Sequence, residues 1–229
     1  MLILHEDLHS EAMHIAKVLE ETLQIEPQLQ SQDLSFLFKP LRKFKGFWHS
    51  CEEISEHFQA GKKEDVVMVL TPKDIYFGDK SKEDDFCFAY VQNDAQKTSI
   101  VISTARLKGE DGSPRTKLEV PQESYHKRLA VISLHEIGHD IIRGNHLQEA
   151  VWVNAETRYE ISTGLHCPNN SCVLYQVGDV KTPDPKNGYI RVGNENRFDT
   201  GLDDLISRLK PEFFCADCKK SMRIYRRYK

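Results

Sequence analysis

The feature that most constrains this chain is the sequence His-Glu-Ile-Gly-His at positions 135–139. It lies in the run from Tyr125 to Arg143, where apolar residues recur at helical spacing, so His135 and His139 fall one turn apart on one helix face. Two imidazoles placed in this way can bind one zinc ion, and Glu136 can take a proton from a water on that ion. This is the chemistry of metal-assisted peptide hydrolysis. The alternative is an ordinary helix with two histidines and a solvated glutamate.

Composition narrows the class of protein. The 229 residues are 39% hydrophobic and 29% charged, which is ordinary for a globular protein. The formal net charge of −4 gives no overall field that would attract nucleic acid or an anionic membrane. No apolar run approaches the about 20 residues that span a bilayer, and the chain starts with polar residues directly after Leu4. We therefore expect a cytoplasmic protein that makes no membrane contact.

The remaining pattern predicts strands and helices in a single α+β arrangement. Strands are expected at 1–4, 33–37, 66–70, 86–91 and 99–104, and helices at 10–23 with Ser10 as the cap, 50–58, 121–144, 147–161 and 202–209. Loops are expected at 39–45, which is basic, at 79–85 and at 108–116, and a long irregular segment at 177–200. The run Val66–Leu70 is continuously apolar, which is typical of a strand buried on both faces.

Four of the six cysteines form two close pairs, Cys167 with Cys172 and Cys215 with Cys218. Short loops with these spacings present thiolates to one tetrahedral zinc ion. The intervening residues are loop-like, which favours a structural four-thiolate zinc over buried free thiols. The other two cysteines, at positions 51 and 87, have no close partner in the sequence, and we expect them to be packing residues.

Taken in order, the histidine helix, the stretch Gly164-Leu165-His166-Cys167 and the cysteine pairs resemble the archaemetzincins, a family of metzincin-type zinc metallopeptidases. The resemblance extends upstream through VMVLTPKDIY (67–76) and IVISTARL (100–107). It implies a zincin-like fold with a twisted mixed β-sheet, an active-site helix and a small zinc-bound C-terminal subdomain, acting on a peptide or protein substrate. It also implies two Zn²⁺ ions, a catalytic one on His135, His139 and His166 with Glu136 as general base, and a structural one on Cys167, Cys172, Cys215 and Cys218.

The sequence departs from the family pattern at two places. Ile142 stands where the family has a chain-turning glycine, and a long extra segment follows, so we expect an insertion over 142–163 that loops out as a helix or hairpin. Leu174 replaces the methionine that packs beneath the metal, a change that should cost less than about 1.5 kcal/mol. The expected organisation is one metallopeptidase domain with an N-terminal subdomain (1–144), an insertion (145–163) and a C-terminal subdomain (164–229).

The residues alone leave the third ligand of the catalytic zinc open. On an unbroken helix His146 would lie about 16 Å along the axis from His135, too far to share an ion. Glu156 or Glu160 would give a site with two histidines and one carboxylate. His166 is favoured because zinc on the neighbouring cysteines would fix the chain directly after it.

Three further expectations concern substrate and partners. The strand at 86–91 is the candidate edge for an extended peptide, by analogy with the family. Tyr159 or Tyr175 could assist the oxyanion, although a tyrosine in either place is more often packing. The second function considered is a non-catalytic, zinc-stabilised binding protein that contacts nucleic acid through the basic residues 219–229. Because the rest of the chain is acidic, we expect a solvated terminus there and no nucleic-acid partner.

Overall fold

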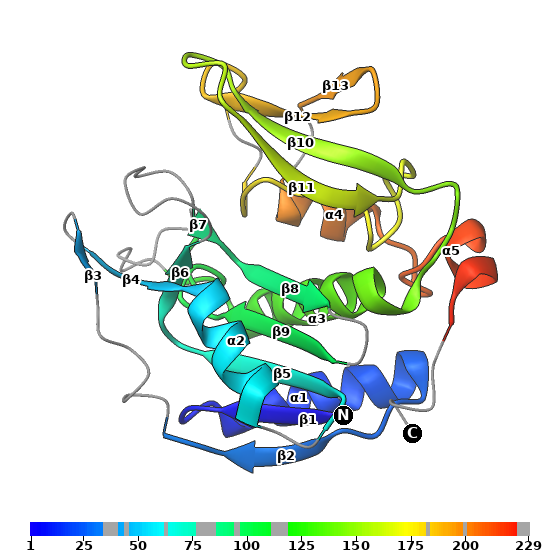
Figure 1. The fold of residues 1–229 in the computed structure, drawn as a ribbon. Helices are drawn as coiled ribbons and strands as arrows, with labels where there is room; N and C mark the ends of the chain where they lie inside the picture. The colour runs from blue at the N-terminus through cyan, green and yellow to red at the C-terminus, as the bar shows by residue number, and fades with distance from the viewer. Residues whose placement is uncertain are drawn as a thin grey trace. The chain divides into compact units, whose positions relative to one another are not determined.

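The computed structural model describes residues 1–33, 41–43, 46–61, 64–76, 86–93, 97–110, 119–181, 184–198 and 201–223. The described chain forms two compact units, unit 1 over Met1–Asp140 and unit 2 over Ile141–Arg223 (Figure 1). No helix in the described part of the chain is long and apolar enough to cross a membrane.

Unit 1 is built on a five-stranded mixed sheet. Its strands are β1 (Leu2–His5), β2 (Gln28–Ser31), β5 (Val66–Thr71), β8 (Ala89–Asn93) and β9 (Thr98–Ser103), in the order β2-β1-β5-β9-β8. The first four in that order run parallel, and β8 runs antiparallel to β9 at the edge. Every residue of β1, β5 and β9 is buried. This confirms the prediction of a mixed sheet with a central strand buried on both faces.

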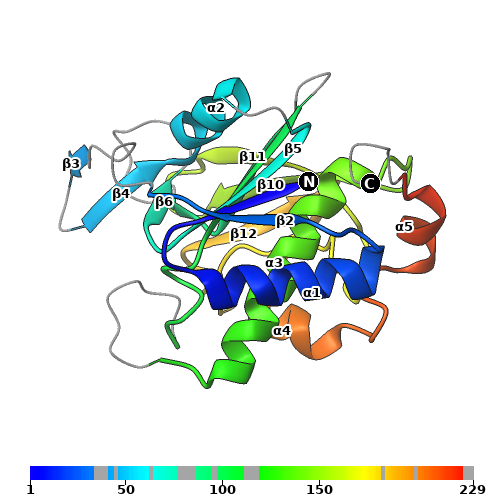
Figure 2. The same cartoon turned by 90° about the horizontal axis from the view of Figure 1, so that it is seen from below.

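Three helices cover this sheet, α1 (His9–Leu23), α2 (Cys51–Gly61) and α3 (Gln122–Ile141). Helices α1 and α3 lie on one face and α2 on the other (Figures 1 and 2). Ile54 and Phe58 of α2 pack in one core cluster with alternate residues of the strands, such as Leu4 and Val69. The opposite faces of the same strands point to α1 and α3, which explains why no strand residue in the centre reaches water.

The beginnings of the helices were predicted with mixed success. Pro121 directly precedes α3, as expected of a residue whose missing N–H costs nothing there. Ser50 precedes α2, and its Oγ accepts a hydrogen bond from the Glu53 N–H at 3.3 Å. Ser10 is not the cap of α1, because the helix begins one residue earlier and the Ser10 hydroxyl donates to Glu11 instead.

A second, smaller sheet of unit 1 contains β3 (Leu41–Lys43), β4 (Gly46–Ser50), β6 (Asp74–Tyr76) and β7 (Phe86–Cys87), in the order β3-β4-β6-β7. The predicted basic loop is therefore wrong where it is described, since 41–43 pair with β4. The predicted strand at 86–91 is divided at Phe88, with β7 in this sheet and β8 in the larger one. Residues 34–37 and 79–85 lie outside the described residues, as does most of 108–116.

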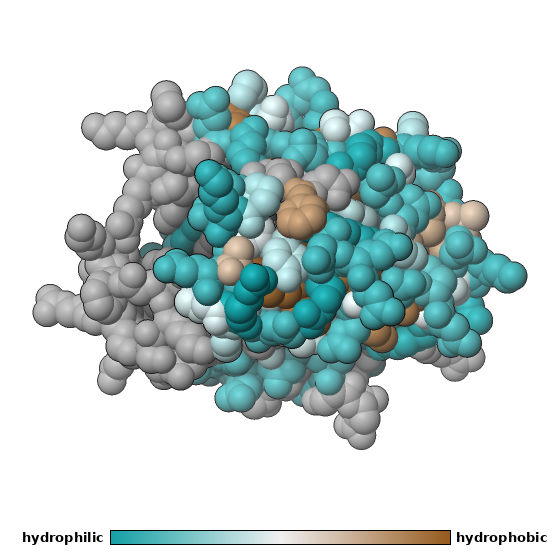
Figure 3. Space-filling view, turned by 90° about the horizontal axis from the view of Figure 1, so that it is seen from above, coloured by the Kyte–Doolittle hydropathy of each residue, from teal (hydrophilic) through white to brown (hydrophobic). Residues whose placement is uncertain are grey.

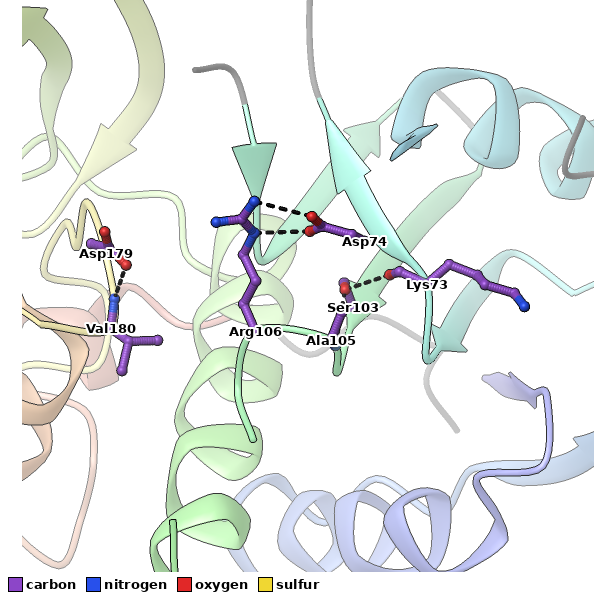
Figure 4. Close-up of polar contacts among 7 residues, drawn as sticks. All are labelled: Lys73, Asp74, Ser103, Ala105, Arg106, Asp179 and Val180. Atoms are coloured by element: carbon purple, nitrogen blue, oxygen red, sulfur yellow. Dashed lines mark hydrogen bonds and ion pairs between the residues drawn. The ribbon is translucent and has the colours of Figure 1, made fainter. Parts of the chain in front are cut away.

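A two-bond ion pair joins the two sheets of unit 1 (Figure 4). Arg106, which follows β9, donates from Nε and Nη2 to the Asp74 carboxylate of β6, at 2.8 and 3.0 Å. Nearby, the Ser103 hydroxyl donates to the Lys73 carbonyl at 2.6 Å. Both members of the ion pair are largely buried, so their contact is desolvated and its geometry restrained. The connection between β9 and α3 is thereby held against the smaller sheet.

Unit 2 contains a four-stranded antiparallel sheet and two short helices. Its elements are β10 (Gln148–Asn154), β11 (Glu160–His166), β12 (Gly188–Val192), β13 (Glu195–Arg197), α4 (Leu202–Arg208) and α5 (Ala216–Ser221), with strand order β11-β10-β12-β13. The predicted helix at 202–209 is confirmed. The predicted irregular segment at 177–200 is wrong over β12 and β13, because β12 pairs with β10 on one side and with β13 on the other. In the view of Figure 3 hydrophilic side chains dominate and most hydrophobic ones appear singly.

The predicted helix at 147–161 is also wrong, because this stretch forms most of the β10–β11 hairpin. Asn154 ends β10, and its Oδ1 accepts hydrogen bonds from the Glu156 and Thr157 N–H groups at 3.0 and 2.9 Å. Such a turn reverses the chain where a helix would continue. The extra segment after α3 is thus a hairpin, one of the two forms expected for it. Helix α3 itself ends at Ile141, before the predicted stop at Gly144, because Ile142 pairs with Met222.

Candidate zinc centres

Helix α3 presents the two histidines of the sequence motif together. The Nε2 atoms of His135 and His139 lie 3.1 Å apart, and their rings meet edge to face at 76°. His135 is only 5% exposed. Two imidazole nitrogens this close on a buried helix face can bind one metal ion, as residues four apart in the sequence predict. Zinc fits this donor set because it readily takes imidazole ligands.

Glu136 lies between the two histidines in the sequence and is 9% exposed. Burial raises the pKa of its carboxyl from 4.5 to about 8, because the charged form loses its hydration. At neutral pH the metal-free side chain is therefore largely protonated. A cation in its neighbourhood favours the carboxylate and lowers this pKa again. A nearby cation therefore makes Glu136 better able to accept a proton, because it keeps the carboxyl ionised.

Buried polar contacts fix α3 within unit 1. Asp140, directly after the second histidine, is fully buried and accepts a hydrogen bond from Thr98 Oγ1 of β9 at 3.0 Å. Arg128 is also buried, and its Nη1 donates to the carbonyls of Leu107 and Gly109 at 2.8 and 2.7 Å. These contacts join segments distant in the sequence, so no local pattern predicts them. Buried hydrogen bonds of this kind restrain a helix strongly, because breaking one would leave a polar group with neither a partner nor water.

In unit 2 the four predicted cysteine ligands come together. The Sγ atoms of Cys167, Cys172, Cys215 and Cys218 all lie within 4.8 Å of one another. Two of the separations, Cys167 to Cys215 and Cys172 to Cys218, are 3.6 Å. Zinc–sulfur bonds of about 2.3 Å in a tetrahedron place the sulfurs about 3.8 Å apart, so the cluster fits one Zn²⁺. None of the four forms a disulfide.

Without metal, these thiols share their protons unequally. Hydrogen bonds with the thiols of Cys167 and Cys218 lower the pKa of Cys172. Hydrogen bonds with backbone groups lower this pKa by a smaller amount. The neighbouring thiols Cys167 and Cys172 raise the pKa of Cys218, because a second thiolate beside the first is disfavoured. A divalent cation removes that repulsion, and zinc sites of this kind bind thiolates in place of thiols.

His166 is the last residue of β11 and directly precedes Cys167. It is 1% exposed, and its Nδ1 lies 3.1 Å from the carbonyl oxygen of Gly164. When Nδ1 carries the proton and donates to that carbonyl, the lone pair lies on Nε2. A backbone carbonyl on the second ring nitrogen is the usual arrangement for a zinc-binding histidine.

The rival ligands make other contacts. Nε2 of His146 lies 3.2 Å from Sγ of Cys218. Glu160 is exposed and accepts two hydrogen bonds from Arg191, at 2.8 and 2.5 Å, which lower the pKa of its carboxyl. Glu156 is exposed in the turn between β10 and β11. These side chains are therefore engaged elsewhere or face solvent.

Of the other residues considered for the site, Tyr175 and Leu174 are buried and Tyr159 is exposed. Tyr175 is 3% exposed, and the guanidinium groups of Arg197 and Arg208 lie 5.0 and 5.6 Å from the centre of its ring, an arrangement that suits packing. Tyr159 is exposed. Leu174 is fully buried, and its carbonyl accepts a hydrogen bond from the Cys167 N–H at 3.0 Å.

Cysteines 51 and 87 lie in unit 1, apart from the zinc ligands in the sequence. Cys51 is the first residue of α2 and belongs to its core cluster, and Cys87 packs against that cluster. A hydrogen bond with Cys51, and then burial, raises the pKa of Cys87. Raised thiol pKa values suit packing residues more than reactive ones. Of the basic segment 219–229, residues 224–229 lie outside the described residues.

The fold belongs to the class seen in archaemetzincins and related zinc-dependent peptidases. The structure of archaemetzincin from Methanopyrus kandleri superposes with a TM-score of 0.54 at 19% identity, covering 96% of this chain and 91% of that one. Archaemetzincin from Archaeoglobus fulgidus, solved with malonate, gives 0.52 at 19%, covering 97% and 100%. A zinc-dependent peptidase from Methanocorpusculum labreanum gives 0.50 at 15%, covering 96% and 99%. No protein-family model and no curated protein matches the sequence, so the likeness is one of fold.

Proposed function

We propose that this protein is a zinc metallopeptidase of the archaemetzincin type that hydrolyses peptide bonds. The observation that carries the proposal is the close pair of His135 and His139 nitrogens on α3, within a fold shared with zinc-dependent peptidases. In this proposal His135, His139 and His166 hold the catalytic zinc, and Glu136 is the general base. The two units then act as one cytoplasmic metallopeptidase domain.

Glu136 is suited to proton transfer by its surroundings. When bound, zinc supplies a Lewis acid that polarises a carbonyl and acidifies water. Glu136 accepts the proton released on attack and passes it to the leaving amine. Without metal, burial raises the pKa of this carboxyl to about 8, and the positive charge of a bound zinc ion would favour the carboxylate that accepts the proton.

The assignment of His166 as third ligand rests on its own surroundings in unit 2. Its ring is oriented by the Gly164 carbonyl, and the chain continues directly into the cysteine cluster. A second zinc on those cysteines restrains the backbone next to His166. The alternative ligands Glu160 and His146 have ionic or thiol contacts that they would have to break.

The substrate class is a peptide or protein bound in extended form. Strand β8 is one of the two edge strands of the five-stranded sheet, and an extended peptide can add to such an edge through main-chain hydrogen bonds. Main-chain recognition of this kind depends little on side chains. We therefore expect any sequence preference to come from contacts of the substrate's side chains and not from the strand pairing itself.

The test is the substitution Glu136→Gln. It should leave the zinc content unchanged, because Glu136 is not a ligand in this proposal, and abolish cleavage of a mixed peptide library followed by mass spectrometry. The matched control is Glu123→Gln, an exposed position on the same helix. A Glu136→Gln protein that cleaves as fast as the parent would overturn the mechanism.

A further inference from the structure

The ring of His146 lies against the cysteine cluster of unit 2. Its Nε2 is 3.2 Å from Sγ of Cys218, within hydrogen-bonding distance of a sulfur acceptor. His146 is not one of the four residues whose ligand atoms are all mutually close. Four thiolates already complete a tetrahedron around zinc, so the imidazole lies outside the set of ligands.

The backbone is shaped to admit this ring. A Cβ atom on Gly144 would lie 2.4 Å from Nδ1 of His146 and 2.6 Å from Oγ of Ser221, so a larger residue at 144 would displace the imidazole. The chain before it is bonded to the end of α5, because the Arg143 N–H donates to the Ser221 carbonyl. The Arg223 N–H likewise donates to the Ile141 carbonyl, at 2.6 Å. These two bonds hold the chain just before His146 against the end of α5, the helix that contains Cys218.

We propose that His146 is a positioning residue for the four-cysteine zinc site, donating its Nε2–H to the Cys218 thiolate. This inference rests on the structural zinc of the proposed function and does not involve the peptidase chemistry. Four thiolates around one Zn²⁺ leave an excess of negative charge, and N–H donors to sulfur reduce it. The Cys215 N–H approaches Sγ of Cys172 at 3.5 Å, so His146 adds a side-chain donor to a cluster that already has a backbone one. Removing a group that hydrogen-bonds to a metal ligand typically weakens metal binding by about 10- to 100-fold.

Cobalt(II) provides the probe, because its sulfur-to-metal charge-transfer absorption reports on thiolate sites and a site of histidines alone does not produce it. The variants are His146→Phe, which removes the donor, His146→Gln, which keeps an N–H group, and Gly144→Ala, which displaces the ring without changing any ligand. His9→Phe, on the exposed surface of unit 1, is the control. Affinity is measured in the full chain by competition with a chromophoric chelator.

We expect His146→Phe and Gly144→Ala to bind cobalt and zinc about 10- to 100-fold more weakly at the thiolate site, with the charge-transfer band moved to lower energy. The ligand-field bands should keep their tetrahedral four-sulfur pattern, and His146→Gln should recover most of the affinity. Unchanged affinity and band position in His146→Phe would overturn the proposal, as would a changed ligand-field pattern, since His146 would then be a ligand. If the parent protein shows no charge-transfer band, the cysteine zinc site itself is wrong. This result does not depend on whether the protein cleaves peptides.

Discussion

Glu136 shows how a single buried residue can link metal binding to stability. In the metal-free protein, burial raises the pKa of its carboxyl to about 8, because the fold excludes water from it. A folded-state pKa above the unfolded value means that the folded state holds a proton that the unfolded state has lost. The stability that this proton supports is fully present below pH 4.5 and is lost as the pH rises through about 8.

The metal-free protein should therefore become less stable between pH 5 and pH 8.5, and Glu136→Gln should abolish most of that loss. The effect is at most about 5 kcal/mol, since one pKa unit corresponds to about 1.4 kcal/mol. Urea unfolding of the metal-free parent and variant at the two pH values measures it. Glu123→Gln is the control, because its carboxyl is exposed. An equal pH dependence in the parent and Glu136→Gln would show that another group is responsible.

The third ligand is a second question at the scale of residues. We expect a weak chelator to remove the zinc of the proposed open histidine site first, and we expect this zinc to be lost from His166→Ala. Glu160→Ala breaks an exposed ion pair with Arg191 and should retain this zinc. His146→Ala should retain it too, while weakening only the cysteine site. Survival of the labile zinc in His166→Ala, with its loss in Glu160→Ala, would place the protein among peptidases with two histidines and one carboxylate.

At the scale of elements, prediction from the sequence succeeded where the pattern was local. The continuous apolar run of β5 and the helical periodicity of α3 each carry their own signal, as do the histidine and cysteine spacings. The segment 147–161 contains strong helix formers, but β10 pairs with β12, more than thirty residues further along the chain. The contacts of Thr98 with Asp140 and of His146 with Cys218 likewise depend on tertiary structure, which no spacing reveals.

The β10–β12 pairing can be tested at Gly188. A Cβ atom there would lie 2.3 Å from the Trp152 ring and 2.8 Å from the Val153 carbonyl, so Gly188→Ala must disturb the strand pair. We expect a loss of about 1–3 kcal/mol in the free energy of unfolding, as for other overpacked sites. Gly193→Asn is the control, because its φ of +56° suits asparagine and a Cβ there would make only an ordinary contact, at 3.5 Å, with the Gln148 side chain. Thermal unfolding of both variants decides the point, and equal stability of Gly188→Ala and the parent would contradict it.

At the scale of the whole molecule, we expect the two units to depend on metal in different ways. Unit 1 has an extensive core under its five-stranded sheet. In unit 2 the described core cluster on the sheet is small, with Ala150, Ile190 and Val192 and the packed Trp152, and other buried apolar residues such as Leu202 and Leu205 lie on the short helix α4. The four cysteines connect the chain after β11 to α5, a helix of only six residues. Unit 2 should therefore gain much of its stability from zinc.

Metal analysis should find about two Zn²⁺ per chain, one at the histidine site and one at the four-cysteine site. Cys167→Ser should lose the more tightly held ion and loosen unit 2, which hydrogen exchange of its amides would detect. Cys87→Ala, in unit 1, should keep both ions because this cysteine only packs against the core. If Cys167→Ser folds normally and retains its full zinc content, the four-thiolate site is wrong.

The separation of the cysteine pairs along the chain has a consequence during synthesis. Every strand of the five-stranded sheet is complete by Ser103 and α3 by Ile141, so unit 1 can fold while later residues are still being added. Cys167 must wait for Cys215, which lies 48 residues further on. At about 5–20 residues per second, that wait lasts about 2–10 seconds. During this interval the nascent chain presents two thiols without their partners, so zinc can close unit 2 only after the ribosome has delivered the second pair.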